Sequence, residues 1–308
     1  MGKYTVRRLL QMIPVVLGVT FLIYWMVFSL PGDPTAGKCG QRPCSDAYVA
    51  KFRADYNLDD PLVVQYGKYL GNVVQGDFGE SQYGVPVSSE LSERFTVTAK
   101  LGIMALAFEG LIGILAGILA GLRKGGFMDS LVLVSTLFVI SLPVFVTGTV
   151  LQVYLGVKAG WFPVTVGADE TVYSLLLPAM VLGSTSLAYL ARLMRSNLSE
   201  NVKSDYVRTA RAKGLPEMRV VGIHTLRNSM IAVVTFLGYD LGALMGGAII
   251  TEGIFNIPGI GGYVFRGIND RDGIVVVGAV TALVLVYLFA NLIVDLLYGV
   301  LDPRISHD

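Results

Sequence analysis

Acidic side chains stand inside long apolar runs at three places in this 308-residue sequence, and for one of them, Asp295 near the cytoplasmic end of the run Ile274–Tyr298, we expect a structural role. Glu109 lies within the run Leu101–Leu122, and Asp240 follows Tyr239 within the run Met230–Ile250. A carboxylate at membrane depth costs about 2.5–3.5 kcal/mol on insertion scales unless it faces protein or water. Glu109, Tyr239 and Asp240 are therefore candidates to line a polar path. A structural pair or a hydrogen bond to a neighbouring helix is the alternative interpretation.

The two cysteines, Cys39 and Cys44, stand in C-x4-C spacing inside the long polar stretch Pro31–Thr98. The topology argued below places this stretch on the oxidising side of a membrane, so we predict a disulfide between them. Free thiols are the alternative. A metal site is not expected there, because no histidine lies nearby.

Motifs for catalysis are missing from the sequence. It contains no G-x4-G-K-[ST] motif, so we expect any ATP to be hydrolysed by a separate subunit. Its histidines, His224 and His307, are not part of H-E-x-x-H, and its serines are not part of G-x-S-x-G. We therefore expect no enzyme activity, and neither a cofactor nor a metal site in this chain. With a formal charge of +1 and no basic patch with interleaved aromatics outside residues 205–227, no nucleic-acid partner is expected.

Residues 205–227 form the most basic stretch and lie between two apolar runs. Ser204 and Asp205 can cap a helix that starts there, because their side chains accept hydrogen bonds from free N–H groups. Gly214 suits a left-handed C-cap, and Pro216 suits the first turn of a second helix that reaches the end of the stretch. The sequence thus predicts two short helices with a bend. A basic loop that only obeys the positive-inside rule, or rests on anionic headgroups, is the alternative.

The elements that must position these groups are apolar runs of about twenty residues. Hydrophobic residues make up 53% of the chain and charged residues 15%, which is too apolar for an ordinary soluble domain. Continuous runs of this length cross a bilayer as helices and not as barrel strands. We therefore predict an all-α integral membrane protein with six spans: Leu9–Leu30, Leu101–Leu122, Leu131–Leu155, Leu175–Met194, Met230–Ile250 and Ile274–Tyr298.

Glycines repeat every fourth residue in two of these spans, at Gly113, Gly117 and Gly121 and again at Gly238, Gly242 and Gly246. Small residues at this spacing let membrane helices approach closely, so both series predict packing surfaces.

Basic residues in the short connections set the predicted orientation. Lys3, Arg7 and Arg8 precede the first span, Arg123 and Lys124 follow the second, and eight basic residues lie between Arg192 and Arg227. By the positive-inside rule both termini are expected in the cytoplasm and the stretch 31–98 outside. The first span is too long for a secretory signal, so we expect it to be retained.

The order of residues in the basic stretch resembles a known motif. Residues 208–215 read R-T-A-R-A-K-G-L, similar to the cytoplasmic "EAA" loop of ABC importer permeases in the form typical of dipeptide, oligopeptide and nickel permeases. The Glu-Ala-Ala of the general motif is Arg208-Thr209-Ala210 here, and Arg227 replaces the proline expected after Leu226, as in the peptide branch. The segment E-x-x-F-x-I-P-G-x-G from Glu252 and the C-terminal D-P-R-I also resemble this branch.

This resemblance implies a six-span type I ABC importer permease with a small extracytoplasmic domain, in the cell (inner) membrane. Its coupling helices dock into the ATPase, which assigns ATPase coupling to Arg208, Thr209, Ala210, Arg211, Ala212, Lys213 and Gly214. The implied partners are a second permease of similar fold, two ATPase subunits or one two-domain ATPase that bind ATP and Mg, an extracytoplasmic substrate-binding protein, and a peptide substrate.

The expected organisation is as follows: 1–30 cytoplasmic N terminus and first span, 31–98 extracytoplasmic domain, 99–298 five-helix core with the coupling loop 195–229, and 299–308 cytoplasmic tail. The alternative function is a self-sufficient, ion-coupled secondary transporter or channel with Glu109 and Asp240 as ion sites. No residue decides between a dipeptide, a longer peptide, nickel or another solute.

Overall fold

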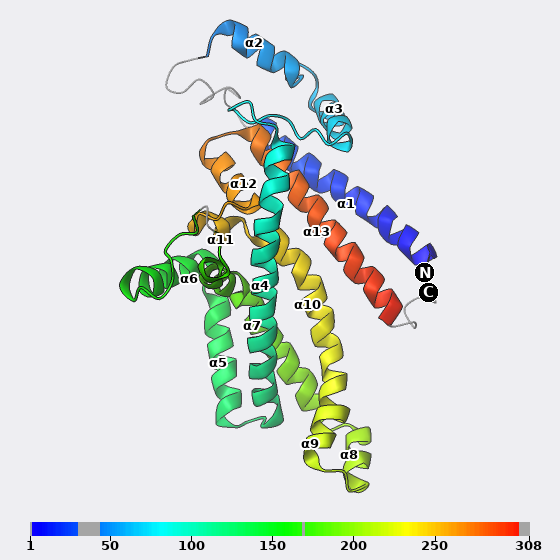
Figure 1. Cartoon of the computed structure of the whole chain (residues 1–308). Coiled ribbons are helices and arrows are strands. Elements are labelled where there is room, and N and C mark those ends of the chain that lie inside the picture. Colours follow the sequence, from blue (N-terminus) through cyan, green and yellow to red (C-terminus); the bar gives the residue numbers. More distant parts are fainter. Residues whose placement is uncertain (1, 30–43, 168–169, 302–308) are drawn as a thin grey trace. The chain divides into compact units, whose positions relative to one another are not determined.

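The computed structural model describes residues 2–29, 44–167 and 170–301. Five of its helices are long and apolar enough to cross a membrane, or six if one bent pair counts as a span. This confirms the all-α membrane class (Figure 1). The chain divides into two compact units: a first unit, Met1–Thr98 with Asn256–Asp308, and a second unit, Ala99–Phe255. The predicted disulfide and the C-terminal D-P-R-I motif involve residues outside the described part of the chain.

The first unit is built around two apolar helices. These are α1 (Gly2–Phe28) and α13 (Gly273–Leu301), and the unit also contains three shorter helices: α2 (Asp46–Asp55), α3 (Leu62–Val74) and α12 (Ile260–Asn269). Tyr24 of α1, Tyr66 of α3 and Val277 of α13 form a buried cluster. The hydroxyl of Tyr69 donates to Thr281 Oγ1 at 2.9 Å, which ties α3 to α13. Aromatic side chains with a polar end thus fasten α3 onto α1 and α13.

Helix α4 (Val87–Leu122) begins well before the apolar run that predicted it. Its polar first turns contain no helix breaker, and Glu90 and Arg94 form an ion pair one turn apart. The predicted extracytoplasmic stretch 31–98 therefore ends in helix, and not in a loop.

The third predicted span, Leu131–Leu155, is wrong as a continuous helix. The chain forms α5 (Phe127–Ser141), then α6 (Val144–Leu151) with the π-helical segment η1 (Gln152–Lys158), and the two parts are bent by 101°. Leu142 is extended at ψ 126°, because a proline disfavours the helical conformation of the residue before it. Pro143, at φ −58°, then starts α6.

In the second unit, α4 packs closely against α7 (Val172–Asn201), with Gly117 at the tightest point. A Cβ added at Gly117 would lie 2.5 Å from Met194 Cβ and 2.7 Å from the Ala191 carbonyl oxygen. Gly113 and Gly121 approach α7 in the same way, so the first glycine series is a packing surface, as its spacing predicts. In the second glycine series, Gly246 does not lie at a close helix contact, because a Cβ added there would meet nothing within 4 Å.

The same contacts give the helix directions. Gly113 faces Leu187 and Leu190 while Gly121 faces Arg195 and Leu198, so α4 and α7 run in the same direction. Helix α10 (Arg227–Gly247) runs against α4, because a Cβ at Gly102 would touch Met245 and one at Gly110 would touch Leu237.

Candidate functional site

The predicted basic stretch is a compact helical element, here called the basic element (residues 205–226). It consists of α8 (Asp205–Ala212), α9 (Glu217–Arg219) and the π-helical segment η2 (Val220–Leu226). Figure 1 shows α8 and α9 at the end of the second unit, between α7 and α10. Helix α8 starts after Ser204 as predicted, but its expected side-chain cap is wrong: Ser204 Oγ donates back to the Asn201 carbonyl at 2.6 Å.

The bend between α8 and α9 depends on Gly214. This residue has φ +74°, the left-handed conformation predicted for it, and its N–H donates to the Arg211 carbonyl at 2.9 Å. Arg211 also reaches across the bend and donates to Glu217 Oε1 at 2.6 Å and Oε2 at 3.2 Å. These hydrogen bonds raise the pKa of Arg211, so its guanidinium stays charged. The bend is thus closed by both backbone and side chains.

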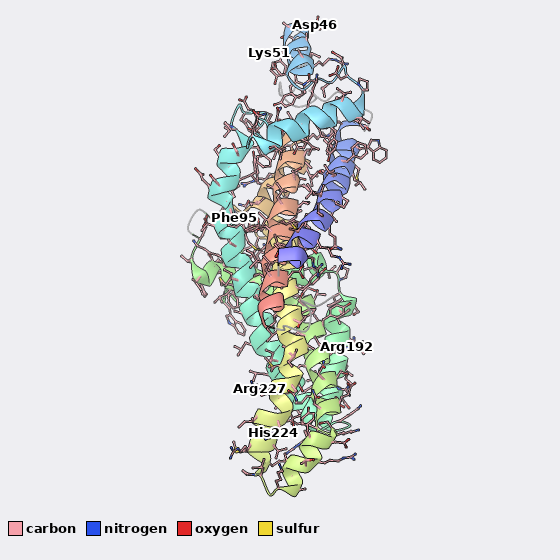
Figure 2. All side chains as sticks on the ribbon, turned by 90° about the vertical axis from the view of Figure 1, so that its right-hand side faces the viewer. Asp46, Lys51, Phe95, Arg192, His224 and Arg227 are labelled. Carbon is pink, nitrogen blue, oxygen red and sulfur yellow. The ribbon has the colours of Figure 1, made fainter. Side chains whose placement is uncertain are left out.

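The sequence predicted that the second helix of the basic element ends at about Arg227, and this prediction is wrong. It continues through η2 into α10, and Figure 2 shows His224 and Arg227 along this passage. The reason is the residue that replaces the motif's proline: Arg227 keeps its N–H and helical backbone, so nothing ends the helix there. Single π-helical turns inside helices are frequent at functional sites.

A chain of hydrogen bonds holds the basic element to both neighbouring helices. The Tyr206 hydroxyl donates to Asn201 Oδ1, and Asn201 Nδ2 donates to Ser229 Oγ, both at 2.9 Å. Ser229 Oγ in turn donates to the Thr225 carbonyl at 2.9 Å. Beneath this chain, the buried Val207, Ala210 and Val220 pack with Leu215. Helix α8 is therefore joined by hydrogen bonds to the ends of α7 and α10.

The predicted coupling residues divide between two faces of the basic element. Ala210 is 5% exposed and packs inward. The other six are exposed: Arg208, Thr209, Arg211, Ala212, Lys213 and Gly214. Sequence reasoning missed Met218, which is 90% exposed. The signal was an apolar residue between Glu217 and Arg219, at the start of a helix whose first turn is otherwise charged.

Two of the acidic residues of the apolar runs come together. Glu109 on α4 is fully buried and Asp240 on α10 is 8% exposed, and their carboxyl groups interact electrostatically. Among the described residues, neither oxygen of Glu109 and not Oδ2 of Asp240 has a hydrogen-bond partner. The neighbouring Tyr239 is 56% exposed and does not share their buried environment. The described residues contain no group of three or more His, Cys, Asp or Glu suited to a metal ion.

An ion pair that the sequence did not reveal lies at the start of α5. Arg195 on α7 donates through Nε and Nη2 to the two oxygens of Asp129, which is buried. Arg195 directly follows the apolar run Leu175–Met194, and Asp129 lies just before the run Leu131–Leu155. These positions were the only signal in the sequence. The pair fastens α5 to α7 on the end of the second unit where Arg195 precedes the basic element.

Comparison with known proteins decides the family. Residues 113–307 match the model described as "Binding-protein-dependent transport system inner membrane component", and residues 1–101 match the corresponding N-terminal model. The chain belongs to this family of ABC importer permeases. Residues 113–307 include the basic element, the bent span and Asp240, whereas Glu109 lies between the two matched regions. The permease has the type I importer fold of this family.

Relatives align with the permease over its whole length. It is 38% identical to the "Di/tripeptide transport system permease protein DppB" of Pseudomonas aeruginosa (strain UCBPP-PA14), with 100% of this chain and 99% of the relative covered. It is 36% identical to the "Dipeptide transport system permease protein DppB" of Escherichia coli (strain K12), with the same coverage. It is 40% identical to the "Glutathione transport system permease protein GsiC" of Salmonella paratyphi A (strain ATCC 9150 / SARB42), with all of both chains covered.

Proposed function

We propose that this permease forms half of the membrane pathway of a peptide importer that is driven by ATP hydrolysis in separate subunits. The observation that carries the proposal is the basic element, an exposed basic surface fixed to two spans. The names of relatives, which refer to dipeptides, di/tripeptides and glutathione at 36–40% identity, support small peptides as the substrate class.

The geometry of the basic element supports ATPase coupling. Arg208, Arg211 and Lys213 give it an exposed positive surface, and Met218 adds an exposed apolar side chain of the kind that anchors protein interfaces. Because Asn201 and Ser229 bind it to α7 and α10, closure of an ATPase dimer against this surface displaces both spans together. Ala210 supports this surface from within.

The carboxylate pair is the proposed polar part of the pathway. Glu109 and Asp240 lie on α4 and α10, and α10 leads directly into the basic element. A displacement of α10 relative to α4 changes the environment of the pair, which links the ATPase to the substrate path by alternating access. In this proposal Tyr239, which is 56% exposed, lines the pathway on the side of the second permease subunit.

The remaining assignments belong to the same proposal. The permease lies in the inner membrane with both termini in the cytoplasm, since the basic connections 123–126 and 203–219 then face the cytoplasm. Residues 31–98 contact an extracytoplasmic binding protein and contain the Cys39–Cys44 disulfide. A second permease subunit completes the pathway, and ATP and Mg bind to the ATPase subunits.

Purification of the tagged permease from its native membrane tests this function. We expect a P-loop ATPase and a second six-span protein to copurify, and the reconstituted assembly to take up a labelled dipeptide only with ATP and the binding protein. If the permease is purified alone and vesicles containing only this chain accumulate solute under an ion gradient, the proposal is wrong and the secondary transporter is correct.

A further inference from the structure

The side chains of Glu109 and Asp240 are buried, and three of their four carboxyl oxygens lack a hydrogen-bond partner among the described residues. We propose that the pair binds a primary ammonium group, the amino terminus of the transported peptide. The inference rests on the proposed function for the identity of the peptide, but the site itself follows from the buried groups.

Burial makes a cation necessary at this position. Glu109 has no exposed surface and Asp240 has 8%, so the pair is almost entirely removed from water. Two unneutralised carboxylates that interact in a low dielectric repel each other and have lost their hydration, and such pairs take up a proton or another cation. A pair in this environment therefore favours a bound positive charge, which a proton or an ammonium group can supply.

Among the described residues of the second unit, the helices that surround the pair supply no such cation. In the second unit, the basic residues of α4, α7 and α10 are Lys100, Arg192, Arg195 and Arg227. Lys100 pairs with Glu170 at 3.9 Å, and Arg195 pairs with Asp129. Arg192 and Arg227 lie towards the basic-element end of their helices (Figure 2). The contacts of Gly110 with Leu237 and of Gly113 with Leu187 place Glu109 several turns away from that end.

The number of free acceptors favours an ammonium group over a metal ion. Three buried oxygens lack a hydrogen-bond partner among the described residues: Oε1 and Oε2 of Glu109 and Oδ2 of Asp240. A primary ammonium has three N–H donors and one positive charge. One such group therefore provides a donor for every unpartnered oxygen. A sodium ion would need further oxygen ligands that the pair does not provide.

The exposed fraction indicates the route of entry. Asp240 keeps a small exposed surface and its neighbour Tyr239 is 56% exposed, whereas Glu109 is fully buried. An ammonium group thus meets Asp240 first and reaches Glu109 as it becomes desolvated.

Carbodiimide labelling of the complete wild-type assembly in lipid vesicles tests this site. Dicyclohexylcarbodiimide reacts with protonated carboxyl groups in apolar surroundings, and mass spectrometry locates the adduct. Without peptide we expect labelling at Glu109 or Asp240. Alanyl-alanine and methylammonium should each lower its rate at least fivefold, whereas N-acetyl-alanyl-alanine and sodium chloride should leave it unchanged. Asp129 is the control carboxyl, which should stay unlabelled because Arg195 keeps it ionised.

Three outcomes overturn the ammonium site: no labelling of either residue, labelling that methylammonium does not slow, or equal protection by sodium or by the acetylated peptide. A Glu109→Gln assembly provides a second measurement, in which methylammonium should no longer protect Asp240. ATP-dependent dipeptide uptake by the same vesicles is measured separately. Loss of methylammonium protection with intact uptake refutes the site alone, whereas protection without uptake refutes the proposed transport function.

Discussion

Arg195 on α7 donates hydrogen bonds to both carboxylate oxygens of Asp129 on α5, with 2.9 Å between Nη2 and Oδ2. Asp129 Oδ2 also accepts from the Gly125 N–H at 2.8 Å. One buried carboxylate thus fixes the connection between α4 and α5 and joins it to the end of α7, next to the basic element.

Asp129→Asn should destabilise the permease strongly. It leaves the guanidinium of Arg195, whose side chain is 18% exposed, without its counter-charge. Loss of one member of such an ion pair is destabilising, because the remaining charge loses its partner. Thermal unfolding of the purified assembly should show a clear drop in Tm. Asp59→Asn is the control, because Asp59 pairs with Arg53 at an exposed position and such pairs contribute about 0–1 kcal/mol. Equal Tm values for the two variants would contradict the structural role of Asp129.

Gly117→Ala should weaken the packing of α4 against α7. The new Cβ would lie 2.5 Å from Met194 Cβ and 2.7 Å from a backbone oxygen, and overpacking of this kind costs about 1–3 kcal/mol. Gly110→Ala is the matched control on the same helix, since its Cβ would make ordinary contacts with Leu237 at 3.7 Å. Denaturation of both variants in detergent should place Gly117→Ala below the wild type and Gly110→Ala at or above it. The reverse order would exclude this packing.

Gly214→Ala should reduce coupling between transport and ATP hydrolysis. Its Cβ meets nothing within 4 Å, so the effect comes only from the left-handed backbone at φ +74°, which costs alanine about 1 kcal/mol. We expect ATP hydrolysis stimulated by the binding protein to fall several-fold, with normal membrane insertion. Gly222→Ala also meets nothing within 4 Å but has no positive φ, and it should keep the wild-type rate. Identical rates of stimulated ATP hydrolysis in the two variants would show that the left-handed conformation of Gly214 is not needed for coupling.

Tyr206→Phe should loosen the link between the basic element and α7. It removes only the hydroxyl that donates to Asn201 Oδ1, at a residue that is 41% exposed, so a stability loss of about 1 kcal/mol or less is expected. The larger effect should be a lower number of peptides transported per ATP hydrolysed in vesicles. Tyr83→Phe, at a 76% exposed turn residue, controls for loss of a tyrosine hydroxyl. An unchanged ratio would mean that α7 is moved by other contacts.

The sequence predicted those features that depend on local pattern. Apolar runs identified the spans, and Gly214 with Pro216 identified the bend, because a left-handed glycine and a proline act through their own backbone conformation. The glycine spacing on α4 predicted close packing, because small residues at this spacing let a neighbouring helix approach. Glu109 and Asp240 were recognised individually by their cost in an apolar run.

Features that depend on which helices meet were not predictable in this way. Nothing in the sequence indicates that Asp129 meets Arg195, since the two are joined only by the packing of α5 on α7. Hydropathy also hid the break at Pro143, because the residues on both sides of it are equally apolar. The Asn201–Ser229 bond joins two helix ends that only the fold brings together.

The break at Pro143 has a consequence for membrane sidedness. Since α4 and α7 run in the same direction, the end of α4 and the start of α7 face opposite aqueous compartments, and the intervening chain must cross the bilayer an odd number of times. Helix α5, with 15 residues, is only about 22 Å long, less than the ~30 Å of the hydrocarbon core. The part after Pro143 is turned by 101° from α5, so it adds almost nothing along the direction of α5, and Pro143 marks the point where the chain leaves that direction. A membrane-impermeant thiol reagent should reach a cysteine placed at 125 and one placed at 160 from opposite sides.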